Sequence, residues 1–174
     1  FLGWLRDGGT DWSKHPTRED AMREYARVWT LLGDRQIEEL VELPLITDAE
    51  VLDTLDVFLE AVTPSFFADE HLTSLVVSRL VSLSLEYGNC DASCYGYVWL
   101  AVFASPRFGN YNDGYRFGQL GYDLVEKRGL TRYRARTYLS VGALVTPWTK
   151  HPASGRDLVR RAFDAFYRAG ELAF

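Results

Sequence analysis

The residues of this sequence that could carry chemistry are its three histidines and two cysteines. His15, His71 and His151 each lack a second histidine, a cysteine or a carboxylate at a chelating spacing, and a structural zinc ion needs about four ligands. We therefore expect no metal site. Cys90 and Cys94 lie four residues apart, so a helix beginning by residue 89 would place both thiols on one face. They are either small half-buried residues at a helix start or a redox pair whose pKa the helix N-terminus lowers; we favour the first.

Motifs of catalysis are absent from the sequence. It has no Walker-type phosphate loop, no Gly-x-Ser-x-Gly and no His-Glu-x-x-His. Gly114, Gly118 and Gly121 resemble a nucleotide-binding glycine pattern, but no strand precedes them, so we expect them to let neighbouring helices approach closely. The carboxylates beside apolar helix positions, where solvated charge is usual, are Asp53, Asp56 and Glu60. We expect neither enzyme activity nor a cofactor.

Aromatic residues are the excess of this composition. The 10 Tyr, 10 Phe and 5 Trp make up 14% of the chain, and most should pack between helices because each ring buries a large area. A minority beside arginines could line a concave recognition surface, since Tyr, Trp and Arg dominate binding hot spots. The candidate binding residues are Tyr95, Trp99, Arg107, Tyr111, Arg116, Arg134, Tyr138 and Trp148.

The elements that must position these side chains repeat along the chain. Gly88, Gly129 and Gly170 recur at a constant offset of 41 in the numbering. The same offset links Leu83 to Leu124, Tyr97 to Tyr138, Ala101 to Gly142, Pro106 to Pro147 and Gly114 to Gly155. A fixed period of roughly 20 to 50 residues marks a solenoid, in which each unit buries its apolar face against the next. Within one period, an apolar segment over 92–104, a Pro and Gly break and a periodic segment over 115–128 predict two helices.

The predicted fold is therefore all-α. We expect an α-solenoid of antiparallel helical hairpins, TPR-like, with repeats over about 48–88, 89–129 and 130–170 in one continuous domain, 48–174. Residues 1–47 form an N-terminal helical cap or connecting segment, irregular over 3–14. Thr17 with Asp20, then Asp48 and Asp69, are predicted helix N-caps, and the helix from Asp48 should end at Pro64. The first residue, a phenylalanine, suggests a fragment of a longer chain.

Charge and hydropathy exclude some classes of function. The net charge is −5 and the basic residues are scattered, so the stripe that neutralises nucleic-acid phosphates is missing. No apolar run approaches the roughly 20 residues that a bilayer requires, and no signal peptide opens the chain. Two cysteines make no disulfide framework. We expect a cytoplasmic protein that binds neither nucleic acid nor membrane.

Several long segments resemble one known family. They are RLVSLSLEYGN (79–89), SCYGYVWL (93–100), PRFGNY (106–111), GYRFGQLGYDLVEKRGL (114–130), PW (147–148) and GRDLVRRAFDA (155–165), preceded by WTLLG (29–33), IEEL (37–40) and LPL (43–45). They are similar to the TPR-like helical-repeat segment of very large multidomain signalling kinases, which join a serine/threonine-kinase-like domain, a STAND-type AAA ATPase, this segment, a GAF domain and a histidine kinase.

The resemblance transfers no catalytic residue, because the catalytic motifs of that family lie in its other domains. It implies a helical scaffold or interaction module that couples the ATPase to the sensor and histidine kinase domains. Its partners would be other domains of the same chain or partner signalling proteins. The alternative is a small-molecule sensor that binds a ligand in an aromatic-lined concave groove. The period of 41 exceeds the ~34 of a standard TPR, which leaves the choice between TPR and HEAT-like repeats open.

Overall fold

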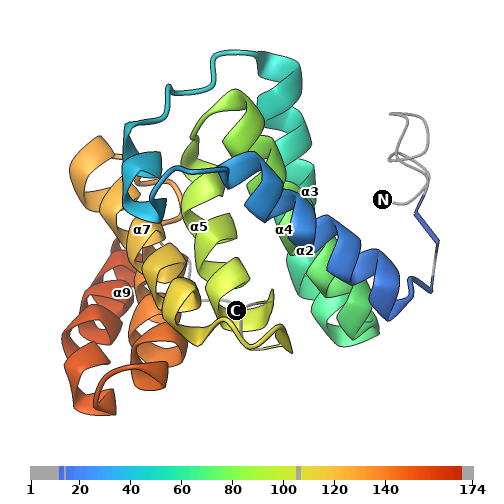
Figure 1. The fold of residues 1–174 in the computed structure, drawn as a ribbon. Coiled ribbons are helices and arrows are strands. Elements are labelled where there is room, and N and C mark those ends of the chain that lie inside the picture. Colours follow the sequence, from blue (N-terminus) through green and yellow to red (C-terminus); the bar gives the residue numbers. More distant parts are fainter. Residues whose placement is uncertain (1–11, 14, 105–106, 170–174) are drawn as a thin grey trace.

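The computed structural model describes residues 12–13, 15–104 and 107–169, and within these ranges the protein is all-α (Figure 1). Its α-helices are α2 (Arg18–Leu32), α3 (Ala49–Ala68), α4 (Glu70–Tyr87), α5 (Asp91–Trp99), α7 (Tyr111–Arg128), α8 (Arg134–Ser140) and α9 (Arg156–Ala169). Short 3-10 helices are η1 (Ile37–Glu42), η4 (Thr146–Trp148) and η5 (Pro152–Gly155), and π-helices are η2 (Leu100–Ala104) and η3 (Val141–Val145). In the described part, strand-like pairing amounts to one isolated bridge between Leu45 and Asn89. The irregular segment expected over 3–14 and the boundary expected at Gly170 fall largely outside these ranges.

Local capping signals position the helix starts as predicted. The Thr17 hydroxyl accepts a hydrogen bond from the Asp20 backbone N–H at 3.2 Å, and the Asp20 carboxylate accepts one from the Thr17 N–H at 3.0 Å. Asp48 and Asp69 likewise accept backbone N–H bonds in the first turns of α3 and α4. These caps satisfy donors that a helix N-terminus otherwise leaves free, so the sequence alone was sufficient to predict them.

The prediction that α3 ends at Pro64 is wrong, because the helix continues to Ala68. A proline inside a helix lacks the N–H for one backbone bond and costs about 3 kcal/mol. Packing of the last turn offsets this cost: Ser65 is buried and donates to the Val62 carbonyl at 2.7 Å, and the Phe66 ring contacts Trp99 with centroids 5.8 Å apart. Asp69 follows as the C-cap residue of α3 and is also the N-cap of α4.

Three pairs of consecutive helices follow one another across the molecule. Figure 1 shows α3 with α4, then α5 with α7, then α8 with α9. Gly88 and Gly129 follow the last residues of α4 and α7, both at positive φ, where glycine avoids the strain of a side chain. In the second and third pairs the first α-helix passes directly into a π-helix, and the starts of η2 and η3 are separated by the same offset as the glycines.

The N-terminal segment 18–46 lies along the second helices of the pairs. Helix α2 packs against α4, and η1 packs against α7. The buried Asn89 side chain donates to the Leu40 carbonyl at 2.7 Å, and Arg128 donates to the carbonyls of Val41 at 2.5 Å and Leu43 at 3.3 Å. The segment expected as an N-terminal cap therefore covers the surface that α4 and α7 present together.

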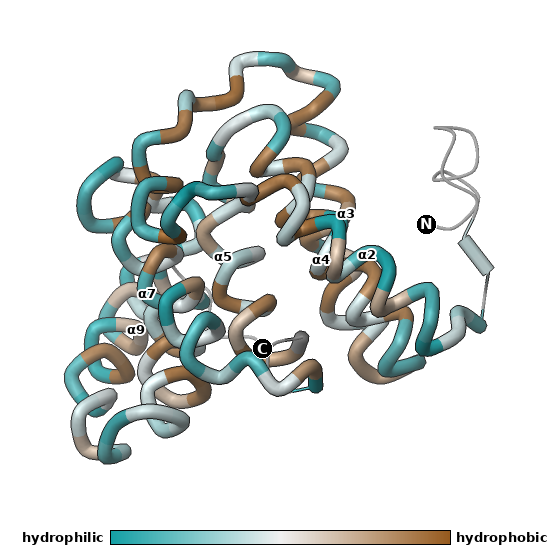
Figure 2. Tube along the Cα trace, viewed as in Figure 1, coloured by the Kyte–Doolittle hydropathy of each residue, from teal (hydrophilic) through white to brown (hydrophobic). Residues whose placement is uncertain are grey.

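The core runs continuously through the three pairs and the N-terminal segment. Its largest fully buried side chains include Tyr97, Phe58 and Phe117, and the rings of Tyr97 and Phe117 stack with centroids 6.0 Å apart. Figure 2 shows hydrophobic and hydrophilic residues alternating along α9, so this helix has one face suited to the core. None of the described helices is both long and apolar enough to cross a bilayer.

Candidate functional site

The eight predicted binding residues do not converge on one groove. Tyr95, Trp99 and Arg107 belong to an aromatic cluster where α3 meets α5 and η2. The Tyr95 and Trp99 ring centroids lie 5.9 Å apart. Arg107 lies 4.4 Å above the Phe103 ring and forms an ion pair with Glu70 at 2.6 Å. Most of this aromatic surface therefore packs between helix pairs.

Tyr111 and Trp148 form a second, separate pair. Their ring centroids lie 5.4 Å apart, and each side chain is about half exposed. Tyr111 is the first residue of α7 and Trp148 ends η4. This contact joins the second helix pair to the third at the surface.

Arg116 holds the N-terminal segment onto α7. Its guanidinium donates to both carboxylate oxygens of Glu38, at 2.7 and 2.6 Å, and also to Gln36 and Asp113. The hydrogen bonds from Arg116 lower the pKa of Glu38 to about 2, and the pKa of Arg116 rises for the same reason. Arg116 is thus engaged by the protein itself, and its place in a recognition surface stays a prediction.

Tyr138 belongs to a group of side chains that joins the second pair to the third, and Arg134 lines the same surface hollow as Tyr138 and Arg161. We name this group the Tyr138 cluster; its members are Tyr122 and Glu126 of α7, Tyr138 of α8 and Arg161 of α9. The Tyr138 hydroxyl donates to Glu126, and Arg161 donates to Glu126 at 2.7 Å and to the hydroxyls of Tyr122 and Tyr138 at 3.1 Å. Burial, and then the bond to Glu126, raise the pKa of Tyr138 to about 12. The phenol is therefore a neutral donor at physiological pH.

The outer face of α9 carries two exposed aromatic side chains that the sequence reasoning missed. Phe163 is 65% exposed and Tyr167 is 71% exposed, whereas Ala162 and Phe166 on the opposite side are buried. Phe163 and Tyr167 lie one period after Tyr122 and Glu126. The i, i+4 spacing of these two aromatic residues, one period after Tyr122 and Glu126, was the available signal. The predicted binding residues, which are aromatic residues and arginines, all lie between Tyr95 and Trp148, so they did not include this pair.

The positions one period before Phe163 and Tyr167 lie in α7. There, the half-buried Tyr122 and the exposed Glu126 are contacted by Tyr138 and Arg161 of the following pair. In α9, no element of the described ranges covers Phe163 and Tyr167 to the same degree. Contiguous exposed apolar patches can mark surfaces on which another protein packs.

The two cysteines lie at the start of α5 and both are buried, without a disulfide. Burial raises the pKa of both thiols, which is the opposite of the change that activates a redox cysteine. The Cys94 thiol lies 3.8 Å from the Leu130 carbonyl, in hydrogen-bonding geometry for sulfur. These observations favour the packing role over the redox pair.

The glycines of α7 serve close helix packing, as predicted. A Cβ atom at Gly121 would lie 2.4 Å from the Cys94 carbonyl oxygen, and one at Gly118 would lie 2.6 Å from a methyl group of Val145. Of the three carboxylates noted in the sequence, Asp56 pairs with Arg132 at 2.6 Å and Glu60 lies 3.9 Å from Arg136. Asp56 thus links α3 to the start of the third pair.

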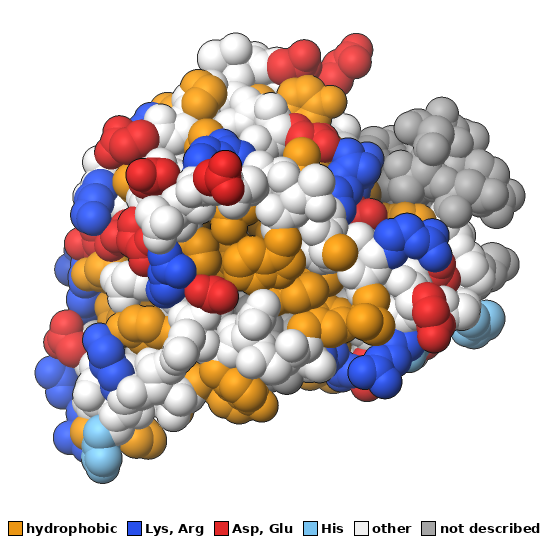
Figure 3. All heavy atoms as spheres, viewed as in Figure 1, with side chains coloured by type: hydrophobic (Ala, Val, Ile, Leu, Met, Phe, Trp, Pro, Cys, Tyr) orange, Lys and Arg blue, Asp and Glu red, His pale blue; other side chains and the backbone are white. Residues whose placement is uncertain are grey.

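Charges of both signs are mixed over the surface. Figure 3 shows Lys and Arg interspersed with Asp and Glu around hydrophobic side chains on the face that it draws. Within the described ranges, no three His, Cys, Asp or Glu side chains lie close enough together to hold a metal ion. Comparison of the chain with family models, with curated proteins and with solved structures gave no match. Two of the described helices each carry two neighbouring exposed aromatic side chains, Phe66 with Phe67 near the end of α3 and Phe163 with Tyr167 on α9. We take the α9 face as the candidate site because its two residues lie one period after Tyr122 and Glu126.

Proposed function

We propose that this chain is a non-catalytic helical-repeat module that mediates protein contacts in a signal-transduction kinase. The observation that carries the proposal is the exposed aromatic pair Phe163 and Tyr167, because the α7 residues one period earlier are contacted by side chains of the next helix pair. The resemblance to large multidomain kinases supplies the context: the contacts would couple an ATPase domain to sensor and histidine kinase domains.

The proposed architecture is an α-solenoid whose period is the offset of 41 found in the sequence. Three features support it: the glycines that end α4 and α7, the π-helices η2 and η3, and the order in which the pairs pack. The backbone N–H of Arg132 also donates at 2.8 Å to the carboxylate of Asp91, which lies one period earlier. The start of the third unit thus contacts the start of the second one.

The last helix pair that the structure describes offers a docking surface. A repeat face exposed only to water is normally polar, whereas the outer face of α9 presents Phe163 and Tyr167. We propose that a helical element of a neighbouring domain or a partner signalling protein packs here, as Tyr138 and Arg161 pack on α7. Aromatic hot-spot residues contribute about 2 kcal/mol each when buried at an interface.

Sedimentation with the neighbouring domains tests the proposal. The chain is mixed with the ATPase domain and with the GAF domain of the same kinase, and complex formation is measured by analytical ultracentrifugation. Replacing Phe163 and Tyr167 together by serine should weaken the complex roughly 30-fold per ring. The matched control is Tyr87→Ser, which removes an aromatic side chain exposed to 53% at the end of α4.

The two outcomes are distinct. Loss of the complex in the double variant, with its retention in Tyr87→Ser and unchanged helicity in both, supports the α9 face. A chain that binds neither domain, or one whose binding survives the double substitution, would refute the proposal.

A further inference from the structure

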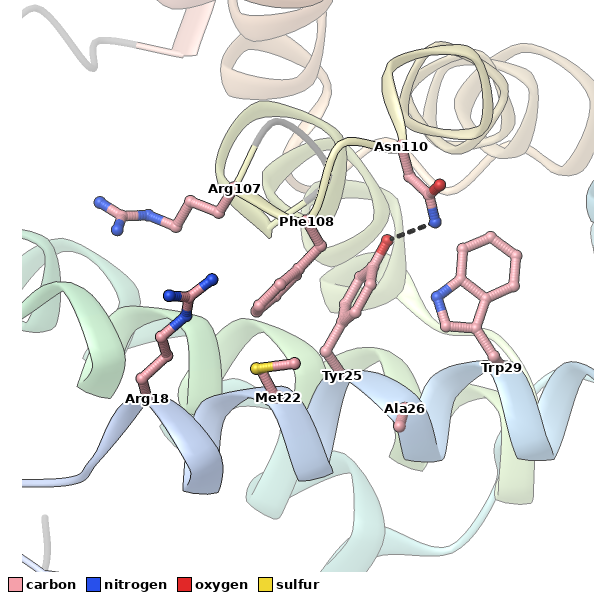
Figure 4. A pocket seen from close by; sticks show the side chains of 8 residues that line it. All are labelled: Arg18, Met22, Tyr25, Ala26, Trp29, Arg107, Phe108 and Asn110. Carbon is pink, nitrogen blue, oxygen red and sulfur yellow. Dashed lines mark hydrogen bonds between the residues drawn. The ribbon is translucent and has the colours of Figure 1, made fainter.

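A cleft separate from the α9 face opens between α2 and the turn over 107–110. Its volume is about 430 Å³, within the range of roughly 300 to 1,000 Å³ that is typical of small-molecule sites. Figure 4 shows side chains entering it from both elements: Met22, Tyr25 and Trp29 from α2, and Phe108 from the turn. Of the predicted binding residues, Arg107 alone lines it.

The charge of the cleft is positive. Arg18 and Arg107 line it, and no carboxylate does, although the whole chain carries a net charge of −5. Arg107 forms an ion pair with Glu70 at 2.6 Å, and the Glu70 side chain is more than half exposed. Arg18 is exposed and forms no ion pair with any described residue. A guanidinium presents several N–H donors in one plane, which suits a carboxylate or a phosphate.

The walls of the cleft are flat and apolar. The Tyr25 and Phe108 rings stack with centroids 4.3 Å apart and planes 25° from parallel, and the Trp29 ring meets Tyr25 edge to face at 6.0 Å. Met22, which is 47% exposed, adds a flexible, polarizable side chain. Such a surface favours a planar ring over a branched aliphatic ligand.

One polar group of the cleft lacks a partner. The Trp29 indole nitrogen is buried and has no hydrogen-bond acceptor among the described residues, and Figure 4 shows it on the side of the ring that faces Tyr25. The Tyr25 hydroxyl already accepts a bond from the Asn110 amide at 3.2 Å, so its own hydrogen is available. Buried donors are normally satisfied, and here an acceptor atom on a ligand would satisfy the Tyr25 hydroxyl.

We infer that this cleft binds a small organic anion that has a flat ring and a carboxylate or phosphate group. The anionic group binds Arg18 and Arg107, and the ring packs on Met22, Phe108 and the edge of the Tyr25 and Trp29 pair. The site is independent of the interaction proposed for α9, so either can fail without the other.

Three matched probes test the inference by isothermal titration calorimetry on the whole chain. They are 2-naphthoate, 2-naphthyl phosphate and the neutral 2-naphthylmethanol, which share one ring system and differ in the anionic group. We expect saturable binding of at least one anion and binding of the alcohol at least about tenfold weaker. The tighter of the two anions distinguishes a carboxylate from a phosphate ligand.

Variants locate the binding in the cleft. Arg18→Gln and Arg107→Gln should each weaken anion binding about tenfold. The matched control is Arg160→Gln, an exposed arginine of α9, which should bind as the unmodified chain does. Thermal unfolding identifies any variant that has lost its fold. Because Arg18 is exposed, Arg18→Gln should remain folded, so its effect on binding can be interpreted directly.

Three results would overturn the inference. One is the absence of saturable binding by both anions. Another is equal affinity for the alcohol, which would indicate ring burial without charge recognition. The third is binding that Arg18→Gln and Arg160→Gln weaken equally, which would indicate a diffuse surface effect.

Discussion

Removing the Tyr138 hydroxyl should measure how firmly the third helix pair is held to the second. In Tyr138→Phe the ring stays in place, but Glu126 and Arg161 both lose a partner. Hydrogen bonds to charged groups contribute about 1.5–3 kcal/mol. The Glu126 and Arg161 side chains are 34% and 37% exposed, so solvent screening reduces the expected loss to about 1 kcal/mol.

Thermal unfolding followed by circular dichroism is the assay. For a chain of this length, a loss of about 1 kcal/mol lowers Tm by about 2–4 °C. The control is Tyr111→Phe, whose hydroxyl has no hydrogen-bond partner among the described residues and which should change stability by less than about 0.5 kcal/mol. Equal Tm values for the two variants would refute the role assigned to the Tyr138 hydroxyl. A double-mutant cycle with Glu126→Gln should then give the coupling between the two side chains directly.

Two further predictions concern helix packing and acid stability. Gly121→Ala places a Cβ atom against the Cys94 carbonyl oxygen, a backbone atom that cannot rotate away. It should lower the free energy of unfolding, measured in urea, by about 1–3 kcal/mol. Gly118→Ala meets only the Val145 side chain and should lower it less, so the reverse order would contradict the packing role of Gly121. Because Arg116 lowers the pKa of Glu38 to about 2 in the folded chain, the unfolded chain binds more protons as pH falls. This contribution to stability is complete above the unfolded pKa of about 4.5 and is lost as pH falls towards 2, so Tm should fall more steeply in that window for the unmodified chain than for Glu38→Gln.

Local chemistry made much of the fold predictable. Thr17, Asp48 and Asp69 cap helices because their side chains reach backbone donors within three residues, and glycine at 88 and 129 follows a helix end for an equally local reason. The error at Pro64 has the opposite cause. A proline in the sequence predicts a helix end. The contact between Phe66 and Trp99, which favours continuation of the helix, is visible only in the structure.

The candidate sites were less predictable, because they depend on contacts between distant residues. Arg116 looked available in the sequence, but its partner Glu38 lies 78 residues away. The α2 cleft forms because Asn110 and Phe108 meet Tyr25 across about the same separation. Phe163 and Tyr167 were within reach of sequence reasoning, since their offset of one period from Tyr122 and Glu126 is visible without coordinates.

The position of the N-terminal segment has a mechanical consequence. Residues 18–46 span the first and second helix pairs and are bonded to both, through the Arg27 and Glu86 ion pair on α4 and the Arg116 and Glu38 ion pair on α7. Because one continuous backbone segment carries both Arg27 and Glu38, a change of angle between the first and second pairs must break at least one of these ion pairs. The third pair is joined by side chains such as Asp56 with Arg132 and by the Tyr138 cluster. Bending should therefore concentrate at the junction of the second and third pairs, so that α8 and α9 swing together while the rest remains rigid.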